Sequence, residues 1–133
     1  MRALIFQGEI SGEALMLNGM YANVPGTGRV LTSKAKAWKK AAATELMRFA
    51  PFDKGPLDSD QRLHLELTFY GRWEDKKGLP IKKDADGATK APQDVLCAYL
   101  GIDDRRIYRV SSEKVHAPPE QARTVLCLYA LPK

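Results

Sequence analysis

Two aspartates one residue apart, Asp84 and Asp86, are the side chains in this sequence best suited to chemistry. They lie in the stretch KKDADGATK, which begins with a pair of lysines and ends at Lys90. In an extended segment, residues two apart project from the same face, so both carboxylates can point at one site. Crowded carboxylates repel each other unless a cation neutralises them, and hard oxygen ligands suit Mg²⁺ or Mn²⁺. The spacing therefore predicts a divalent-cation site.

A second acidic pair, Asp103 and Asp104, follows the next helical segment. Because the strand after it can return beside the first pair, we expect all four acids to meet at one edge of a sheet. A metal held there can lower the pKa of a bound water and stabilise charge on a phosphate in transit. Lys90 lies four residues after Asp86, about one helical turn, and can reach a phosphate oxygen or the attacking water. Such a set is expected of a metal-dependent nuclease.

A structural interpretation of the same acids stays open. Asp86 can cap the helix, worth about 1 kcal/mol, and Asp103 and Asp104 can be turn residues. Pairs of the form D-x-D are common in loops, so their spacing does not decide between the two interpretations. An EF-hand is excluded, because Gly87 falls at the fourth position of the loop and Val95 stands where the twelfth-position glutamate would be.

Composition places these acids in a basic globular protein. The chain has 133 residues, 44% hydrophobic and 28% charged, which predicts one domain over 1–133. A formal net charge of +5 favours a polyanionic partner such as nucleic acid. No apolar run has the length of a membrane helix, and the N-terminal stretch is not typical of a signal peptide. Cys97 and Cys127 lack metal-type spacing, so we expect reduced core residues in a cytoplasmic protein.

The elements that must position the acids are two helices and four strands. Alternating or β-favouring stretches predict strands at 2–10, 62–71, 105–115 and 122–131. A first helix is expected from a cap at Thr32 or Ser33 to about Ala50, and 17–32 reads as a loop or a bent hairpin. A second helix spans 86–101, but Pro92 requires that it either starts near the proline or is kinked. This order predicts an α+β fold, a small mixed sheet with helices packed against it.

The order of the motifs resembles the RusA family of Holliday-junction resolvases. The resemblance lies in KKDADGATKAPQDVL followed by YLGIDDRRIYRV, and more weakly in LNGMYANVPGTGRVLTSKAKAW upstream. It implies a small homodimeric endonuclease that binds four-way DNA junctions and nicks two strands symmetrically with Mg²⁺, or with Mn²⁺, in DNA recombination and repair. The family's frequent association with prophages suggests a phage-derived protein.

Carried over by position, the resemblance implies that Asp84, Asp86 and Asp104 hold metal, with Asp103 beside them, while Lys90 assists at the phosphate. Three departures stand out. Gly87 replaces the family's usual asparagine after D-x-D, Pro92 interrupts a stretch that is plain helix in the family, and the family's double proline near its first strand is absent. Two rival hypotheses are a RusA-like protein that binds branched DNA without turnover and a basic structural domain.

Basic residues around the acids are candidates, as a group, for contacts to DNA phosphates, although for any single one of them a solvated surface charge is the better explanation. They are Lys82, Lys83, Arg105, Arg106, Arg29, Lys34 and Lys36, with Lys39 and Lys40 as extensions of the same surface. Trp73 and Tyr21 stand in loop-like segments, where an aromatic ring can stack on an opened base. Asn18 is a further weak candidate. Trp38 is expected in the core.

Overall fold

A mixed four-stranded sheet forms the centre of the computed structural model, which describes residues 2–133. Its strand order is β1 (Ala3–Ser11), β6 (Arg123–Ala130), β4 (Leu63–Gly71), β5 (Ile107–His116). Strand β6 pairs antiparallel with both β1 and β4, whereas β4 and β5 run parallel. The other elements are the helices α1 (Ser33–Leu46) and α2 (Ala85–Leu100) and a separate hairpin of β2 (Tyr21–Val24) and β3 (Gly28–Leu31). Short 3₁₀ helices lie at Leu17–Gly19, Asp104–Arg106 and Pro119–Gln121. The predicted α+β fold is confirmed.

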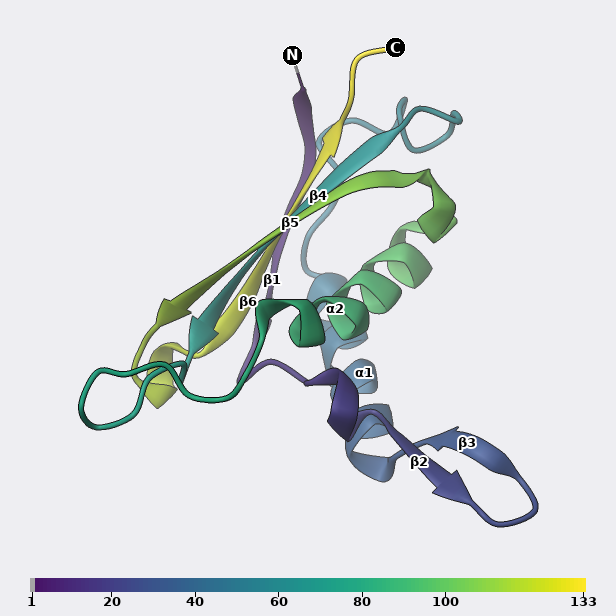
Figure 1. Cartoon of the computed structure of the whole chain (residues 1–133). Coiled ribbons are helices and arrows are strands. Elements are labelled where there is room, and N and C mark those ends of the chain that lie inside the picture. Colours follow the sequence, from purple (N-terminus) through teal and green to yellow (C-terminus); the bar gives the residue numbers. More distant parts are fainter. Residues whose placement is uncertain (1) are drawn as a thin grey trace.

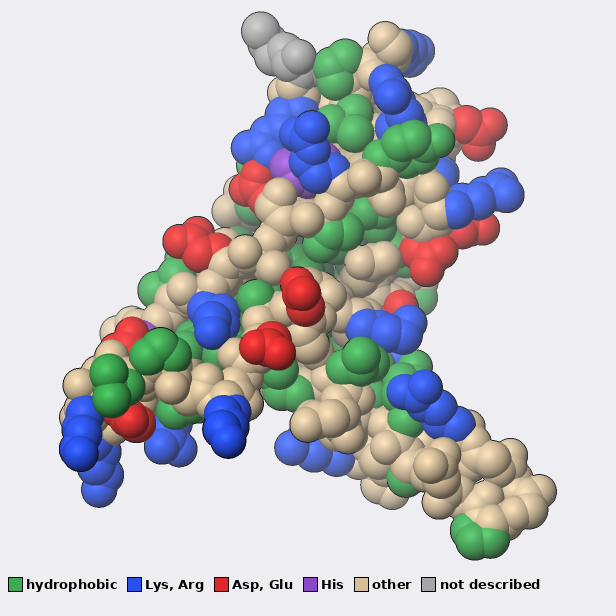
Figure 2. All heavy atoms as spheres, viewed as in Figure 1, with side chains coloured by type: hydrophobic (Ala, Val, Ile, Leu, Met, Phe, Trp, Pro, Cys, Tyr) green, Lys and Arg blue, Asp and Glu red, His purple; other side chains and the backbone are tan. Residues whose placement is uncertain are grey.

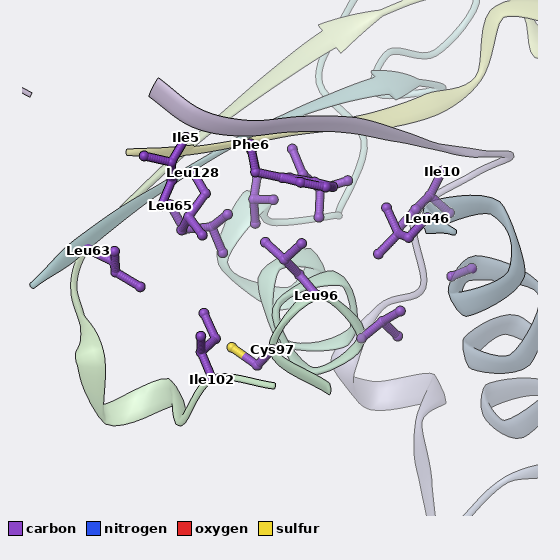
Figure 3. Packing of buried hydrophobic residues seen from close by; sticks show 14 of the residues in the cluster. Ile5, Phe6, Ile10, Leu46, Leu63, Leu65, Leu96, Cys97, Ile102 and Leu128 are labelled. Atoms are coloured by element: carbon purple, nitrogen blue, oxygen red, sulfur yellow. The ribbon is translucent and has the colours of Figure 1, made fainter. Parts of the chain in front are cut away.

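Both helices pack on one face of the sheet, and the core lies between the two layers (Figure 1). Strand β4 shows why, since Leu63, Leu65, Leu67 and Phe69 are fully buried while the side chains between them, His64 apart, are half-buried. Side chains in a strand alternate between its faces, so the leucine positions all turn toward the helices. Figure 3 shows Leu65 and Leu128 from the sheet facing Leu96 from α2.

Helix α1 begins as the sequence predicts and ends earlier. Thr32 is its N-cap, and the Thr32 hydroxyl accepts a hydrogen bond from the Ala35 N–H at 3.1 Å. The helix ends at Leu46, not near Ala50. The residue before a proline disfavours helical backbone, and Pro51 follows Ala50. The chain instead closes in short turns and brings the Phe52 N–H to the Ile5 carbonyl at 2.7 Å.

Helix α2 has its N-cap two residues before the expected one and passes through its proline. Asp84 is the N-cap, so Asp86 lies inside the first turn. The helix continues through the buried Pro92 to Leu100, and Gly101 closes it with a left-handed φ of 68°. A start near Pro92 is therefore wrong. At Gly87 an added side chain would meet the Met16 methyl group at 3.0 Å, so the small residue lets the N-terminal segment pack closely on α2.

The unit β4–α2–β5 decides where the acids lie. Because β4 and β5 are parallel neighbours, the chain must cross back between them, and α2 makes that crossing along the sheet. The start of α2 therefore lies where β4 ends, and the end of α2 lies where β5 begins. Sixteen helical residues separate these points by about 24 Å. Residues just before and just after α2 occupy opposite ends of the sheet.

Candidate active site and nucleic-acid interface

A cleft of about 450 Å³ lies where the start of α2 faces the segment before the hairpin. Asp84 and Gly87 line it from α2, Asn18 and Arg29 from the opposite side, and the two lysines at 82–83 from the loop that leads into the helix. In Figure 2 the surface is concave between this loop and the hairpin, with acidic side chains over the start of α2 and basic ones around them. Carboxylates in a basic recess suit a cation and a phosphate together.

Asp84 and Asp86 are exposed, and their carboxylates are not used to build the helix. Asp84 occupies the N-cap position, but its side chain makes no capping hydrogen bond. Asp86 makes one contact through its backbone carbonyl, which accepts from the Thr89 hydroxyl at 2.9 Å. The interpretation of Asp86 as a helix cap is therefore wrong. Both carboxylates stand at the positive end of a helix dipole, which favours negative charge.

Lys90 follows on the same side of α2, one turn further on. It lines a hollow of about 400 Å³ together with Leu17, Tyr21 and Arg29, and two of these residues, Leu17 and Arg29, also line the cleft of Asp84. The two hollows therefore adjoin. The Lys90 ammonium is half-exposed and pairs with the Asp94 carboxylate at 3.3 Å.

Asp103 and Asp104 lie at the far end of α2, so the expectation that all four acids meet in one chain is wrong. Within residues 2–133, no three His, Cys, Asp or Glu side chains form a group that could hold a metal ion. Asp103 has the turn role of the alternative interpretation, because its carboxylate accepts from the Arg105 N–H at 3.0 Å. That hydrogen bond, with the charge of Arg105 nearby, lowers the pKa of Asp103. Asp104 is exposed beside it.

The basic residues named from the sequence divide between the two ends of α2. Arg29, Lys82 and Lys83 line the cleft beside Asp84. Lys34 and Lys36 are exposed at the start of α1, Lys40 is exposed one turn later, and Lys39 is half-buried. Arg105 lies at the far end, where its guanidinium pairs with Asp103 at 3.6 Å and remains largely exposed.

Arg106 has a structural position instead. Its guanidinium donates hydrogen bonds to the carbonyls of Leu57 at 2.9 Å and Gln61 at 3.0 Å, and also to that of Pro56. These carbonyls belong to the connection between α1 and β4, which has no regular structure of its own. The side chain therefore fastens that connection to the start of β5, and its donors already have partners.

Replacing Arg106 by alanine is expected to lower the free energy of unfolding by about 1–3 kcal/mol, because three carbonyls lose a charged donor. Replacing the exposed Arg105 by alanine is expected to change it by about 0.5 kcal/mol or less. Urea denaturation of both variants measures this. Junction affinity, measured by fluorescence anisotropy, is expected to fall for Arg105→Ala and to stay unchanged for folded Arg106→Ala. If Arg105→Ala instead lost more stability and Arg106→Ala lost more junction affinity, Arg106 would be a DNA contact.

The aromatic candidates differ from each other in exposure. Trp73 is only 5% exposed, and its indole N–H donates to the Phe69 carbonyl at 2.8 Å, so the hypothesis that it stacks on a base is wrong. Tyr21 is half-buried, and the Arg29 guanidinium lies over its ring at 4.3 Å. This contact orients Arg29 at the border of the cleft. Trp38 packs against the core, as predicted.

A histidine–serine pair on the face of the sheet opposite the helices is not a nucleophile and base. His64 Nε2 and Ser111 Oγ are 2.8 Å apart, and His64 Nδ1 lies 3.0 Å from the Arg2 guanidinium. Arginine only donates, so Nδ1 accepts and Nε2 carries the proton. The protonated nitrogen faces the serine and cannot remove its proton. The pair is a satisfied polar contact of a buried histidine.

Stability is expected to fall below neutral pH because of His64. Burial, with the charge of Arg2 nearby, lowers the pKa of His64 from its ordinary value of 6.5. Between the lowered pKa and 6.5 the unfolded chain binds more protons than the folded one, so the free energy of unfolding rises with pH through this window and falls as pH drops. Urea denaturation at about pH 7.5 and about pH 5.5 tests this. We expect a smaller loss in His64→Gln than in wild type; an equal loss in both would contradict the assignment.

Sequence reasoning missed Asp94 and predicted both cysteines to be reduced core residues. Asp94 lies four residues after Lys90, a spacing that marks a helical ion pair, and that spacing was the available signal. Cys97 is buried, and burial raises the pKa of its thiol to about 11, so it is an unreactive core residue. Cys127 is half-buried, and neither cysteine forms a disulfide.

Comparison with known proteins identifies the family. The model of the family described as Endodeoxyribonuclease RusA matches residues 16–125, which include both acidic pairs and Lys90. The chain belongs to this family. No curated protein matches it. In the part of the chain that the structure describes, no helix is long and apolar enough to cross a membrane.

Proposed function

We propose that this chain, as a member of the RusA family of endodeoxyribonucleases, is a divalent-cation-dependent nuclease that makes paired nicks in four-way DNA junctions. The observation that supports this best is the placement of Asp84 and Asp86, which are exposed and unpaired at the start of α2. Asp84 lines the basic cleft there, and Lys90 lines the adjoining hollow. The two lysines at 82–83 and Arg29 bind the phosphates on either side of the scissile bond. Lys90 donates to the phosphate and stabilises the charge that develops there.

The donor chemistry of Asp84 and Asp86 fits Mg²⁺, or Mn²⁺, because both side chains offer free carboxylate oxygens at a solvent-accessible position. When bound, the cation supplies Lewis acidity, which makes water more acidic and offsets negative charge on the phosphate. The two aspartates alone leave the ligand set incomplete, since no third acid of the same chain joins them among residues 2–133. Asp104, the remaining motif acid, lies at the other end of α2.

A second copy of the chain would complete the site. An antiparallel pair of α2 helices, related by a twofold axis near their middle, brings the start of one helix to the end of the other. Asp84 and Asp86 of one subunit would then share a cation with Asp104 of the other. The dimer would hold two such sites, which matches the two equivalent strands of a four-way junction.

The groove between α1 and α2 is a surface suited to this contact. The hollow has a volume of about 420 Å³. Its apolar lining is Ala43 of α1, Met47 just after that helix, and Val95, Ala98 and Tyr99 of α2, and the paired Lys39 and Asp94 also line it. Met47 is 72% exposed there, which is unusual for a large apolar side chain. The groove runs beside the C-terminal half of α2, next to the proposed twofold axis, so a second copy would cover apolar surface close to the required place.

Strand nicking tests the proposed function. A labelled four-way junction and a linear duplex of the same sequence are incubated with the protein in Mg²⁺ or in EDTA. We expect symmetric nicks in the junction, in Mg²⁺ only, and little cleavage of the duplex. Tight junction binding by folded protein without nicks would instead favour a member that binds branched DNA without turnover. If the protein neither prefers the junction nor nicks it, the aspartates have a structural role instead.

A further inference from the structure

Asp94 holds two lysines from two helices. Its carboxylate lies 3.3 Å from the ammonium of Lys90, four residues earlier in α2, and 3.3 Å from that of Lys39 in α1. The Asp94 side chain is 27% exposed, so both pairs are partly shielded from water. One carboxylate balances two positive charges here, in the lining of the α1–α2 groove.

Lys90 has another acid at the same spacing on its other side. Asp86 precedes Lys90 by four residues, as Asp94 follows it by four. On an isolated helix, an acid four residues before a lysine is the better arrangement of the two. Within residues 2–133, however, Asp94 is the only acid within ion-pairing distance of the Lys90 ammonium. Lys90 therefore pairs with Asp94 and leaves Asp86, the locally favoured partner, free.

We propose that Asp94 is a positioning residue which draws Lys90 away from Asp86 and so keeps the Asp86 carboxylate free for a cation. Without Asp94, Lys90 pairs with Asp86 and competes with the cation for the same oxygens. When a DNA phosphate enters the cleft, Lys90 exchanges Asp94 for the phosphate. The inference rests on the proposed function, because it assigns the cation to Asp86.

Cation binding in the absence of DNA tests this without relying on nicking. Mn²⁺ is titrated into each variant, and the free ion is followed by its electron paramagnetic resonance signal. Asp94→Asn is expected to weaken Mn²⁺ binding about two- to fivefold, which is the size of the competition from one exposed ion pair. Asp94→Glu is expected to restore most of the affinity. Light scattering checks that all variants have the wild-type assembly state.

Two further variants separate positioning from a structural role. Lys39→Gln removes the contact from α1 and keeps the Lys90–Asp94 pair, so its Mn²⁺ affinity is expected to equal that of wild type. Lys90→Met and Lys90→Met/Asp94→Asn are expected to bind Mn²⁺ equally, because Asp94 acts only through Lys90. Equal Mn²⁺ affinity of wild type and Asp94→Asn, with junction nicking intact in wild type, would overturn the positioning role alone. Absence of both Mn²⁺ binding and nicking in wild type would overturn the proposed function and this inference with it.

Discussion

Replacing Asp86 by asparagine is expected to slow Mg²⁺-dependent nicking of a four-way junction by about a hundredfold or more. The loss of a charged cation ligand removes several kcal/mol of transition-state stabilisation, and each 1.4 kcal/mol is about a factor of ten in rate. Junction binding is expected to persist or to tighten slightly, because a negative charge leaves a surface that faces phosphates. Asp86→Asn should therefore lower the nicking rate without lowering the affinity for the junction.

The substitution is a clean one because the Asp86 carboxylate contributes little to the fold. Among residues 2–133 its oxygens have no hydrogen bond or ion pair, and only its favourable place in the first turn of α2 is lost, worth about 1 kcal/mol or less. Asp60→Asn is the matched control, since Asp60 is exposed and lines neither the cleft nor the hollow of Lys90. Single-turnover nicking and urea denaturation are measured on both variants. Nicking by Asp86→Asn within tenfold of wild type would remove Asp86 from the site.

Local chemistry made much of the fold predictable. The alternation of leucines in β4 identified a strand with one buried face, and Thr32 identified the start of α1 through the hydrogen bond that a threonine side chain offers a helix. The pairing of β4 with β5 was not predictable in the same way. Strand β5 lies at an edge of the sheet and is mostly exposed, so its sequence has no hydrophobic pattern that indicates which strand it pairs with.

The candidate site was predictable as a set of residues and not as an arrangement in space. The grouping of Asp84, Asp86 and Lys90 depends on one helical turn, and the structure keeps all three near the start of α2, with Asp84 and Lys90 in adjoining hollows. The grouping with Asp104 depended on the direction in which α2 runs, which follows from the parallel pair of strands. Arg106 was predicted to contact DNA because the carbonyls that it hydrogen-bonds belong to residues 45–50 positions away, and the sequence around Arg106 does not indicate them.

Mixed dimers are expected to show that two subunits share each site. Asp86→Asn and Asp104→Asn homodimers should each nick junctions about a hundredfold more slowly than wild type. A heterodimer with one subunit of each kind has one doubly altered site and one unaltered site if Asp86 and Asp104 act across the interface. It should recover roughly half the wild-type rate per dimer, because one of two equivalent sites remains. If both residues acted within one chain, the same heterodimer would have no intact site.

Two tags on co-expressed subunits allow the heterodimer to be purified, and a supercoiled plasmid with an extruded cruciform gives the readout. Wild type is expected to make paired nicks and yield linear plasmid, whereas the heterodimer yields nicked circles from its single working site. The reciprocal heterodimer pairs a wild-type subunit with an Asp86→Asn/Asp104→Asn subunit, so sharing across the interface leaves it with no intact site. Activity of the reciprocal heterodimer, with none in the first, would place Asp86 and Asp104 in one chain's site and would require a rearrangement of α2. Because the two heterodimers contain the same substitutions in the same number, only the arrangement of the site can produce a difference between them.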